Sequence, residues 1–385
     1  MKQTLTIGLD AKRIVRNGTG LGSYGRTLAN GLADIGGLSL RLYAPDTGRE
    51  ELRRQVPERE NLCYCYPTNL SPLTSLCPPL RKSLWRSRGI TRQLSVDGVQ
   101  VFHGLSGELP AGLRQAGIKS VVTIHDLIFM RHPEYYHWTD TKIYEWKFRQ
   151  TLREADRIVA ISECTRRDIC QLGGIDTAKV GLIYQSCAPR FQKEADERRV
   201  DSVAQRYRLP QRYVLSVGSV EERKNTLLAL KALFWLPADI HLVLVGRRTA
   251  YTGTLTAYAD RHGLRHRLHI LHGVTDDDLP AVYARAEVFV YPSRYEGFGI
   301  PIIEAIGMGL PVVGCTGSCL EEAGGPDNLY VGPDDAEAMA HAIGCMLRGA
   351  EGREERIGRS RHYIERFANT GAAAKFAELY YSLIE

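Results

Sequence analysis

The sequence predicts an α/β protein built from two domains. Short apolar runs rich in β-branched residues, such as Leu5–Leu9 and Ile240–Val245, alternate along the chain with segments of helical periodicity. This alternation is typical of βαβ units that form parallel sheets. The length of 385 residues suits about two domains of ordinary size. Glycine-containing turns follow several of the predicted strands, as in α/β domains that bind ligands at the carboxyl ends of their strands.

The composition is that of an ordinary globular protein. Hydrophobic residues make up 44% and charged residues 24% of the chain, and no run of apolar residues is long enough to span a membrane. The N-terminal stretch alternates like a strand and lacks the apolar core of a signal peptide, so a cytoplasmic location is expected. The nine cysteines form no C-x-x-C pair and are expected to be reduced thiols. The net charge of +6 suits anionic ligands but is too small to indicate nucleic-acid binding.

The first domain opens with a βαβ unit. The strand Leu5–Leu9 is followed by a glycine-rich turn, a helix and the strand Leu38–Tyr43. Gly20 to Gly25 spell G-x-G-x-x-G, and Asp46 lies about 20 residues further on, the pattern of a nicotinamide-binding Rossmann domain. An NAD-dependent oxidoreductase is therefore one alternative. Against it, the glycines come well after the strand ends, and Asp46 follows Pro45 in an expected loop.

The rest of this domain offers one candidate site residue and one candidate surface. Val99–His103 and Ser120–Ile124 are predicted strands, and His125 at the end of the second is expected to face the ligand crevice. A basic cluster within residues 81–92 predicts either a solvated helix face or a contact with anionic lipid at the inner face of the membrane. The aromatic side chains between Arg131 and Phe148 are expected mostly to pack inside, with some bordering an acceptor.

The charged stretch Pro189–Arg208 predicts the boundary between the domains. The predicted domains are residues 1–190 and 191–366, with a final helix over 367–385. In the second domain, Arg223 and Lys224 follow the strand Tyr213–Val217 at a turn where cations would meet a pyrophosphate. Thr275 and the three aspartates after it predict a helix N-terminus rather than a metal site.

The most informative stretch is Ala286–Pro311. It predicts a strand, a loop containing Glu296, and a helix that starts near Pro301 and ends near Met308. The backbone N–H groups of 298–300 would form an anion site at the helix N-terminus. Two carboxylates beside such a site suggest a ligand with hydroxyl groups as well as phosphates. The alternative is that Glu304, in the first turn, complements the helix dipole and Glu296 is solvated.

The segment EGFGIPIIEA, with Glu296 and Glu304 at its ends, closely resembles the E-x7-E motif of retaining glycosyltransferases of family 4. The resemblance implies the GT-B architecture: two Rossmann-like domains facing across a cleft, with a C-terminal helix crossing back to the first domain. It places Glu296 at the donor sugar and Glu304 on the ribose hydroxyls, and it gives His125 a contact with the sugar. His125 and Glu296 are thus the expected catalytic residues. The expected donor-binding residues are Gly20, Leu21, Gly22, Arg223, Lys224, Val274, Phe298, Gly299, Ile300 and Glu304. One departure is Ser219, where many members carry an arginine.

The implied activity is retaining transfer of a hexose from a nucleoside-diphosphate sugar to a hydroxyl of a glycan or lipid-linked acceptor. The stretches HGLSGELP and RHPEYY resemble those of bacterial cell-surface polysaccharide mannosyltransferases, so the first choice of donor is GDP-mannose. No metal, no cofactor and no nucleic-acid partner are expected. Besides the oxidoreductase, a sugar-nucleotide binder without catalysis is the remaining alternative.

Overall fold

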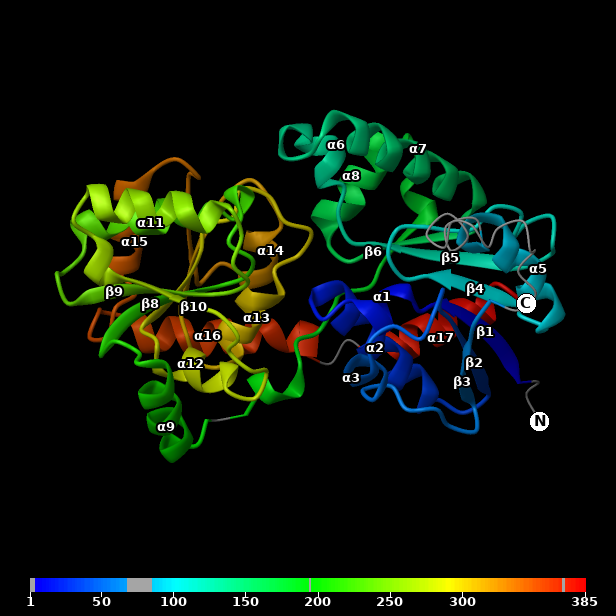
Figure 1. Cartoon of the computed structure of the whole chain (residues 1–385), viewed down its shortest axis with the longest axis horizontal. Helices are drawn as coiled ribbons and strands as arrows, with labels where there is room; N and C mark the ends of the chain where they lie inside the picture. The colour runs from blue at the N-terminus through cyan, green and yellow to red at the C-terminus, as the bar shows by residue number, and fades with distance from the viewer. Residues whose placement is uncertain (1–3, 68–84, 194, 369–370) are drawn as a thin grey trace. The chain divides into compact units, whose positions relative to one another are not determined.

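The computed structural model describes residues 4–67, 85–193, 195–368 and 371–385. The chain forms two compact units (Figure 1). The N-terminal unit comprises Met1–Gln185 together with Thr370–Glu385, and the C-terminal unit comprises Ser186–Asn369. Each unit has its own parallel sheet and its own hydrophobic core.

The N-terminal unit contains a seven-stranded sheet in the order β3-β2-β1-β4-β5-β6-β7. All its strand pairings are parallel, and β1 lies between β2 and β4, with Ile7 opposite both Leu40 and Val101. The strands are β1 (Leu5–Asp10), β2 (Leu38–Tyr43), β3 (Leu62–Cys65), β4 (Val101–Gly104), β5 (Lys119–Ile124), β6 (Arg157–Ala160) and β7 (Val180–Leu182). The helices are α1 (Lys12–Arg16), α2 (Gly20–Ala33), α3 (Glu50–Arg53), α5 (Ile90–Val96), α6 (Ile128–Arg131), α7 (Trp138–Glu154) and α8 (Glu163–Gly173).

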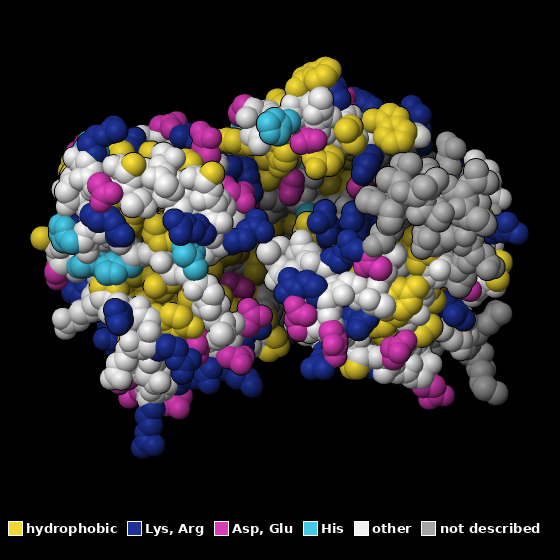
Figure 2. All heavy atoms as spheres, in the orientation of Figure 1, with side chains coloured by type: hydrophobic (Ala, Val, Ile, Leu, Met, Phe, Trp, Pro, Cys, Tyr) yellow, Lys and Arg dark blue, Asp and Glu magenta, His cyan; other side chains and the backbone are white. Residues whose placement is uncertain are grey.

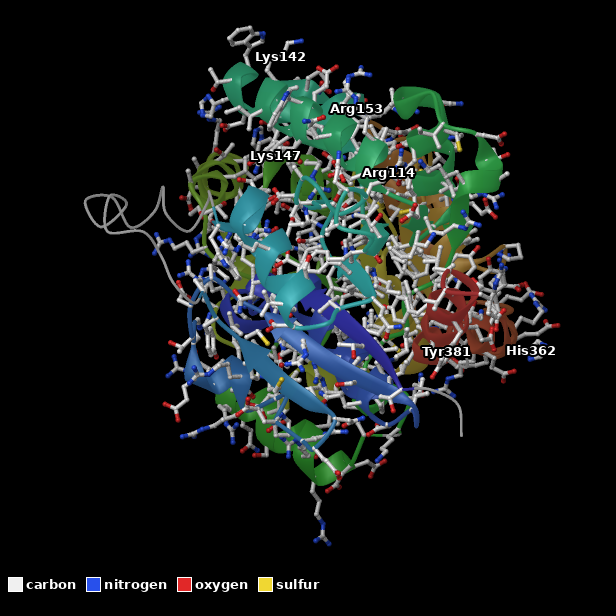
Figure 3. The ribbon with its side chains drawn as sticks, turned by 90° about the vertical axis from the view of Figure 1, so that its right-hand side faces the viewer. Arg114, Lys142, Lys147, Arg153, His362 and Tyr381 are labelled. Atoms are coloured by element: carbon white, nitrogen blue, oxygen red, sulfur yellow. The ribbon has the colours of Figure 1, made fainter. Side chains whose placement is uncertain are left out.

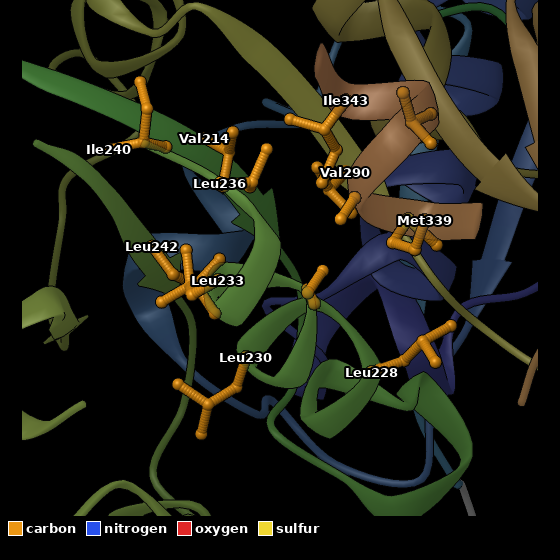
Figure 4. Close-up of a cluster of buried hydrophobic side chains, with 14 of the residues drawn as sticks. Val214, Leu228, Leu230, Leu233, Leu236, Ile240, Leu242, Val290, Met339 and Ile343 are labelled. Carbon is orange, nitrogen blue, oxygen red and sulfur yellow. The ribbon is translucent and has the colours of Figure 1, made fainter. Parts of the chain in front are cut away.

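The C-terminal unit contains a six-stranded sheet in the order β10-β9-β8-β11-β12-β13, again with parallel pairings. The strands are β8 (Arg212–Val217), β9 (Ile240–Val245), β10 (Leu268–Leu271), β11 (Val288–Tyr291), β12 (Val312–Cys315) and β13 (Leu329–Val331). The helices are α9 (Glu197–Tyr207), α10 (Thr226–Ala232), α11 (Tyr251–Arg261), α12 (Leu279–Arg285), α13 (Ile300–Gly307), α14 (Leu320–Gly324), α15 (Ala336–Gly344) and α16 (Arg353–Ala368). Apolar side chains from β8, β9, β11, α10 and α15 form its core (Figure 4).

The last helix, α17 (Ala372–Ser382), belongs to the N-terminal unit. It packs against α2, where Gly31 allows the close approach because a Cβ there would lie 2.9 Å from the Cβ of Ala373. Tyr380 is buried and its hydroxyl lies 2.6 Å from Nδ1 of His103. The predicted return of the C-terminal helix to the first domain is confirmed, although the helix begins at Ala372 and Phe367 lies in α16.

The glycine-rich segment differs from the prediction, because Gly20–Gly25 forms the first turns of α2 rather than a turn before the helix. Close packing requires glycine at position 22, because a Cβ there would lie 1.8 Å from the carbonyl oxygen of Asn17. Helix α1 separates the motif from β1, and Asp46 is ion-paired with Arg16. The geometry of a dinucleotide fingerprint, in which the glycines directly follow the first strand, is therefore not formed.

Candidate active site

Three predicted site residues of the C-terminal unit, Arg223, Lys224 and Glu296, meet where the strand order of its sheet reverses. Strand β8 pairs on one side with β9, the next strand in the sequence, and on its other side with β11. The short 3₁₀ turn Glu222–Lys224 follows β8, and the loop carrying Glu296 follows β11. Ligands of open α/β sheets bind at such a switch point, outside the carboxyl ends of the strands.

Glu296 is the centre of a buried charge cluster. Its side chain accepts from Nζ of Lys224 at 2.6 Å and lies 3.1 Å from Nη1 of Arg223. Nζ of Lys224 also donates to the hydroxyl of Tyr291 at 2.9 Å. Burial alone would raise the pKa of Glu296, but Lys224 and then Arg223 outweigh it and lower that pKa to about 2. The carboxylate in turn raises the pKa of Lys224 against the opposing effect of burial. Two cations and one carboxylate leave one net positive charge at this switch point.

The loop after Glu296 is held by contacts that the sequence did not reveal. The thiol of Cys319 is buried and donates to the carbonyl oxygen of Phe298 at 2.6 Å, and it lies 3.2 Å from that of Glu296. Nη1 of Arg223 donates to the carbonyl oxygen of Tyr295 at 2.6 Å. Gly299 has φ 126°, a backbone conformation that favours glycine, and it caps α13. The order of this loop therefore depends on Cys319 and Arg223 as well as on its glycines.

Glu304 lies on the helix that this loop starts, but not where the sequence analysis placed it. It is the fifth residue of α13, and the first turn contains no acidic residue. Its Oε2 accepts from the hydroxyl of Tyr283 at 3.0 Å. Burial raises the pKa of Glu304 to about 7, while the Tyr283 hydrogen bond lowers it by less. Complementing the helix dipole is therefore not its role.

A small cavity of about 10 Å³ adjoins Lys224. Its lining includes Gly218, Ser219, Lys224, Thr226 and Tyr291. The hydroxyl of Thr226 is buried and has no hydrogen-bond partner among the described residues. Ser219, the departure noted from the family 4 resemblance, carries no charge, so the cations here are Arg223 and Lys224.

His125 follows β5 in the N-terminal unit, at the carboxyl end of that strand, as predicted. Its Nε2 lies 2.9 Å from the carbonyl oxygen of Leu105, and its Nδ1 lies 2.9 Å from the side-chain amide of Gln185. Burial lowers the pKa of His125 to about 4. The ring is thus neutral at pH 7, with Nε2–H donating and Nδ1 accepting. Tyr24 packs edge-on against it, with ring centroids 4.8 Å apart.

The remaining predicted residues are less engaged. Gly20 has open space around it, and Leu21 is half-buried at the start of α2. Val274 is half-buried in the loop between β10 and α12. Phe298 is buried with its ring 5.2 Å from that of Phe367, and Ile300 begins α13.

The acidic run after Thr275 is structural. The hydroxyl of Thr275 accepts from the N–H of Asp278 at 3.2 Å within a turn, and α12 begins later than predicted, at Leu279. The carboxylate of Asp278 is buried and accepts from Arg206 at 2.7 Å and Tyr207 at 2.9 Å, both on α9. Within the described ranges, no group of three or more His, Cys, Asp or Glu residues is arranged to hold a metal ion.

Comparison with known proteins decides the family. Residues 18–186 match the model described as Glycosyltransferase Family 4, and residues 211–349 match the model described as Glycosyl transferases group 1. The chain belongs to this family of glycosyltransferases. The resemblance inferred from EGFGIPIIEA is confirmed, and the protein is a glycosyltransferase.

Among the relatives of this glycosyltransferase is O-antigen chain mannosyltransferase B of Escherichia coli. It is 32% identical over 259 residues, which cover 66% of this chain and 67% of that protein. O-antigen chain mannosyltransferase RfbU of Salmonella typhimurium is 26% identical over 248 residues, covering 64% of this chain and 65% of that protein. The serotype-specific mannosyltransferase WbdA of Escherichia coli is 29% identical over 234 residues, 58% of this chain but only 29% of WbdA.

Solved glycosyltransferase structures share the fold of the whole chain. Sucrose-phosphate synthase of Thermosynechococcus elongatus aligns with a TM-score of 0.79 at 21% identity, covering 99% of both chains. WaaG, a glycosyltransferase involved in lipopolysaccharide biosynthesis, aligns with a TM-score of 0.71 at 17% identity, covering 97% of this chain and 99% of WaaG. Together with the two parallel sheets, these alignments confirm the predicted α/β class with two Rossmann-like domains.

Proposed function

We propose that this glycosyltransferase transfers a hexosyl group, mannose from GDP-mannose as first choice, with retention of configuration. The proposed acceptor is a hydroxyl of a glycan or lipid-linked oligosaccharide in cell-surface polysaccharide synthesis. Support for the sugar and the pathway class comes from the names of O-antigen chain mannosyltransferase B and RfbU. Support for the donor class comes from the charge cluster around Glu296, which is the observation that carries the proposal.

The cluster has the charge that a diphosphate leaving group requires. As the bond between the sugar C1 and the β-phosphate oxygen breaks, negative charge grows on the phosphate. Fixed cations stabilise that charge without the cost of reorienting water. Glu296 balances only one of the two cations Lys224 and Arg223. The N-terminus of α13, with Gly299 as its cap, adds backbone N–H donors for an anion. Protein cations thus supply the positive charge in this proposal, and no metal ion is required.

The proposed steps use each carboxylate differently. Glu304 accepts hydrogen bonds from the ribose hydroxyls, and Glu296 faces the sugar and stabilises an oxocarbenium-like transition state. C1 loses its bond to the phosphate oxygen and gains one to the acceptor oxygen, and the acceptor proton passes to the departing phosphate. For His125 the proposed role is to position the sugar. The neutral ring suits a hydrogen bond to a hydroxyl, which would take the place of the Gln185 amide on Nδ1.

Calorimetry with GDP, UDP and NAD tests the nucleotide class. We expect GDP or UDP to bind in a salt-sensitive manner, and Lys224→Ala to weaken binding by roughly 1.5–3 kcal/mol, the range for hydrogen bonds to charged groups. Lys231→Ala is the matched control, because Lys231 lies in the same unit with Nζ over the ring of Tyr258 and is not among the cations that lower the pKa of Glu296. Unchanged affinity in Lys224→Ala would remove Lys224 from the site, and preferential binding of NAD would refute the donor class.

A transfer assay tests catalysis and stereochemistry. GDP-mannose, UDP-glucose and UDP-N-acetylglucosamine are compared for nucleotide release with and without lipid-linked oligosaccharide acceptors, and the anomeric configuration of the product is read by NMR. Retention with GDP-mannose is the expected result. Binding without release of nucleotide from any donor would favour a sugar-nucleotide binder, and inversion would refute the proposed mechanism.

A further inference from the structure

The basic segment expected at residues 81–92 contributes less to the surface of the N-terminal unit than the sequence predicts. Residues 81–84 lie outside the described ranges. The next two residues turn inward, because Trp85 is buried and Arg86 is ion-paired with Asp10 at 2.8 Å. Trp85 and Arg86 are thus engaged within this unit.

Aromatic side chains of the same unit divide between its surface and its interior. Those between Arg131 and Phe148 were expected mostly to pack inside, but Trp138 and Trp146 are exposed. Hydrophobic side chains accordingly stand out over α6 and α7 in the space-filling view (Figure 2). Tyr380 on α17 is, in contrast, fully buried. Its hydroxyl begins a chain of hydrogen bonds that leads toward His125.

His103 is a fully buried histidine at the centre of this chain. It lies on β4 with 0% of its surface exposed. Its Nδ1 lies 2.6 Å from the hydroxyl of Tyr380, and its Nε2 lies 2.8 Å from Oγ1 of Thr123. Phe376, also on α17, packs against the imidazole with ring centroids 4.8 Å apart. Both ring nitrogens are therefore engaged, one by the C-terminal helix and the other by β5.

The contacts continue from Thr123 to the candidate active site. Thr123 lies on β5, two residues before His125. Its Oγ1 lies 3.0 Å from the hydroxyl of Tyr24, and Tyr24 is the residue that packs edge-on against the ring of His125. Leu105, whose carbonyl oxygen is the partner of Nε2 of His125, lies two residues after His103. The groups that hold His125 thus belong to the same strand ends as the chain of hydrogen bonds.

The burial of Tyr380 decides the direction of these hydrogen bonds. His103 is the hydrogen-bond partner of its hydroxyl within the described part of the chain. A buried O–H group without an acceptor is costly, so Tyr380 donates to Nδ1. Burial lowers the pKa of His103 to about 3, so the ring is neutral at pH 7 and its one N–H, on Nε2, donates to Thr123. The hydroxyl of Thr123 is then available to donate to Tyr24.

We propose that the hydrogen bonds of Tyr380 and Thr123 position the ring of His125 for its contact with the donor sugar. The effect passes through His103 and Tyr24, which join the C-terminal helix to the packing around His125. A polar network in which every member is satisfied makes a buried region rigid, and a site residue must be held close to its productive geometry. Tyr380 and Thr123 are positioning residues, and the inference rests on the proposed function, in which His125 contacts the sugar.

Substitutions of Thr123 interrupt the chain at its middle. Thr123→Val keeps the shape of the side chain and removes the hydroxyl that joins His103 to Tyr24. The kcat for nucleotide release from GDP-mannose should fall about tenfold, because a small misplacement of a positioning group is costly in rate. The KM for GDP-mannose should change by less than about twofold. Thr123→Ser retains a hydroxyl and should restore kcat.

A second pair of variants tests the C-terminal helix. Tyr380→Phe should lower kcat in the same direction, by about threefold, because it removes the donor to His103 and keeps the ring in the core. Tyr381→Phe is the matched control and should keep the wild-type kcat. Tyr381 is the next residue of α17, and its hydroxyl donates to the carbonyl oxygen of Gly37 at 3.0 Å, outside this chain of hydrogen bonds (Figure 3).

NMR of the histidine rings gives a measurement that needs no donor. Long-range ¹H–¹⁵N spectra report the tautomer and hydrogen bonding of each imidazole, and comparison with His125→Gln assigns the signals of His125. These signals should shift in Thr123→Val and Tyr380→Phe and stay in place in Thr123→Ser and Tyr381→Phe. Calorimetry with GDP should show the wild-type affinity in all four variants, because Lys224 and Glu304 lie in the C-terminal unit.

The outcomes separate this inference from the proposed function. A wild-type kcat in Thr123→Val, or an equal loss in Thr123→Ser, would overturn the inference, even if the unfolding temperature falls, since the network would then only stabilise the fold. An unchanged kcat in His125→Gln would refute the contact of His125 with the sugar, and the positioning role with it. If the wild type releases no nucleotide from GDP-mannose, the proposed donor fails, and the NMR signals of His125 alone decide the inference.

Discussion

The Glu304→Gln substitution is expected to make the protein more stable and worse at binding nucleotide, both in a pH-dependent manner. Glu304 is a largely buried carboxyl whose side-chain contact is the hydroxyl of Tyr283, 3.0 Å from Oε2. Burial raises its pKa to about 7, and the Tyr283 hydrogen bond and the charge of Arg190 lower it by less. Glutamine has nearly the same shape, retains an oxygen for Tyr283 and has no charge to bury.

The magnitude follows from the pKa. A rise from the ordinary value of 4.5 to about 7 corresponds to about 3 kcal/mol at ~1.4 kcal/mol per pH unit. Since the folded-state pKa is the higher one, the folded protein keeps this proton at pH values where the unfolded chain has lost it. The contribution to stability is therefore fully present below about pH 4.5 and is lost as the pH rises to about 7. Glu304→Gln should match the wild type at the lower limit and exceed it by up to about 3 kcal/mol above the upper limit.

Nucleotide binding should show the opposite trend. The ionised carboxylate can accept both ribose hydroxyls, whereas the protonated form and the glutamine amide each offer one good acceptor oxygen. GDP or UDP affinity of the wild type should therefore increase as the pH rises through about 7. The affinity of Glu304→Gln should be lower at high pH and nearly independent of pH over that window.

Urea unfolding and calorimetry across this pH range measure both trends on the same variants. Glu337→Gln is the matched control, because Glu337 is an exposed glutamate in the first turn of α15. It should change neither profile. Equal stability of Glu304→Gln and wild type at every pH would refute the argument from burial. An undiminished nucleotide affinity would remove Glu304 from the ribose site.

Three further predictions concern the site and the proposed mechanism. Glu296→Gln should leave GDP affinity nearly unchanged, because the bound phosphate replaces the carboxylate as the partner of Lys224. It should lower turnover by one to two decades, or about 1.4–2.7 kcal/mol of transition-state stabilisation. Abolished nucleotide binding would reverse the placement of the donor. Cys319→Ala should lower the free energy of unfolding by about 1 kcal/mol and weaken nucleotide binding, because it removes the hydrogen bond to the carbonyl oxygen of Phe298. Cys319→Ser should restore both. Calorimetry in which the serine variant behaves like the alanine variant would contradict the role of this hydrogen bond. EDTA should leave transfer intact, and loss of activity that Mn²⁺ or Mg²⁺ restores would overturn the metal-independent proposal.

Elements with a strong local pattern were predictable from the sequence. The strands Leu38–Tyr43 and Ile240–Val245 were predicted with the bounds that the structure shows. Ile240–Val245 is a nearly continuous apolar run, and Leu38–Tyr43 has a leucine at every second position, so burial in a parallel sheet leaves a direct trace in the sequence. The position of Glu296 in a loop after a strand was predictable for the same reason.

The chemistry of the site was less predictable, because it depends on contacts distant in sequence. Glu296 and Lys224 are 72 residues apart, and Tyr283 and Glu304 are 21 apart on different helices. No spacing rule connects such pairs. The error at Gly20–Gly25 has a different cause, because the sequence does not distinguish a glycine needed for close packing from a glycine needed for a turn. A Cβ at Gly25 would lie 2.8 Å from Cγ1 of Ile14, so this glycine permits α1 and α2 to pack closely.

The two glutamates of the loop differ in environment more than in position. Glu296 is placed between two cations, which lower its pKa to about 2, whereas burial raises the pKa of Glu304 to about 7. Environments that separate two carboxyl pKa values commonly assign them different roles. A permanently ionised Glu296 keeps Lys224 charged before the donor arrives, because a buried lysine without a partner would tend to lose its proton. The cluster then carries its positive charge before a phosphate binds.

Glu304, in contrast, can change its ionisation when the ligand binds. Hydroxyl donors favour the ionised carboxylate, so binding of a ribose should lower the pKa of Glu304 and release a proton. Calorimetry near neutral pH in buffers of different ionisation enthalpy would detect that proton, and its absence from Glu304→Gln would assign it to this residue.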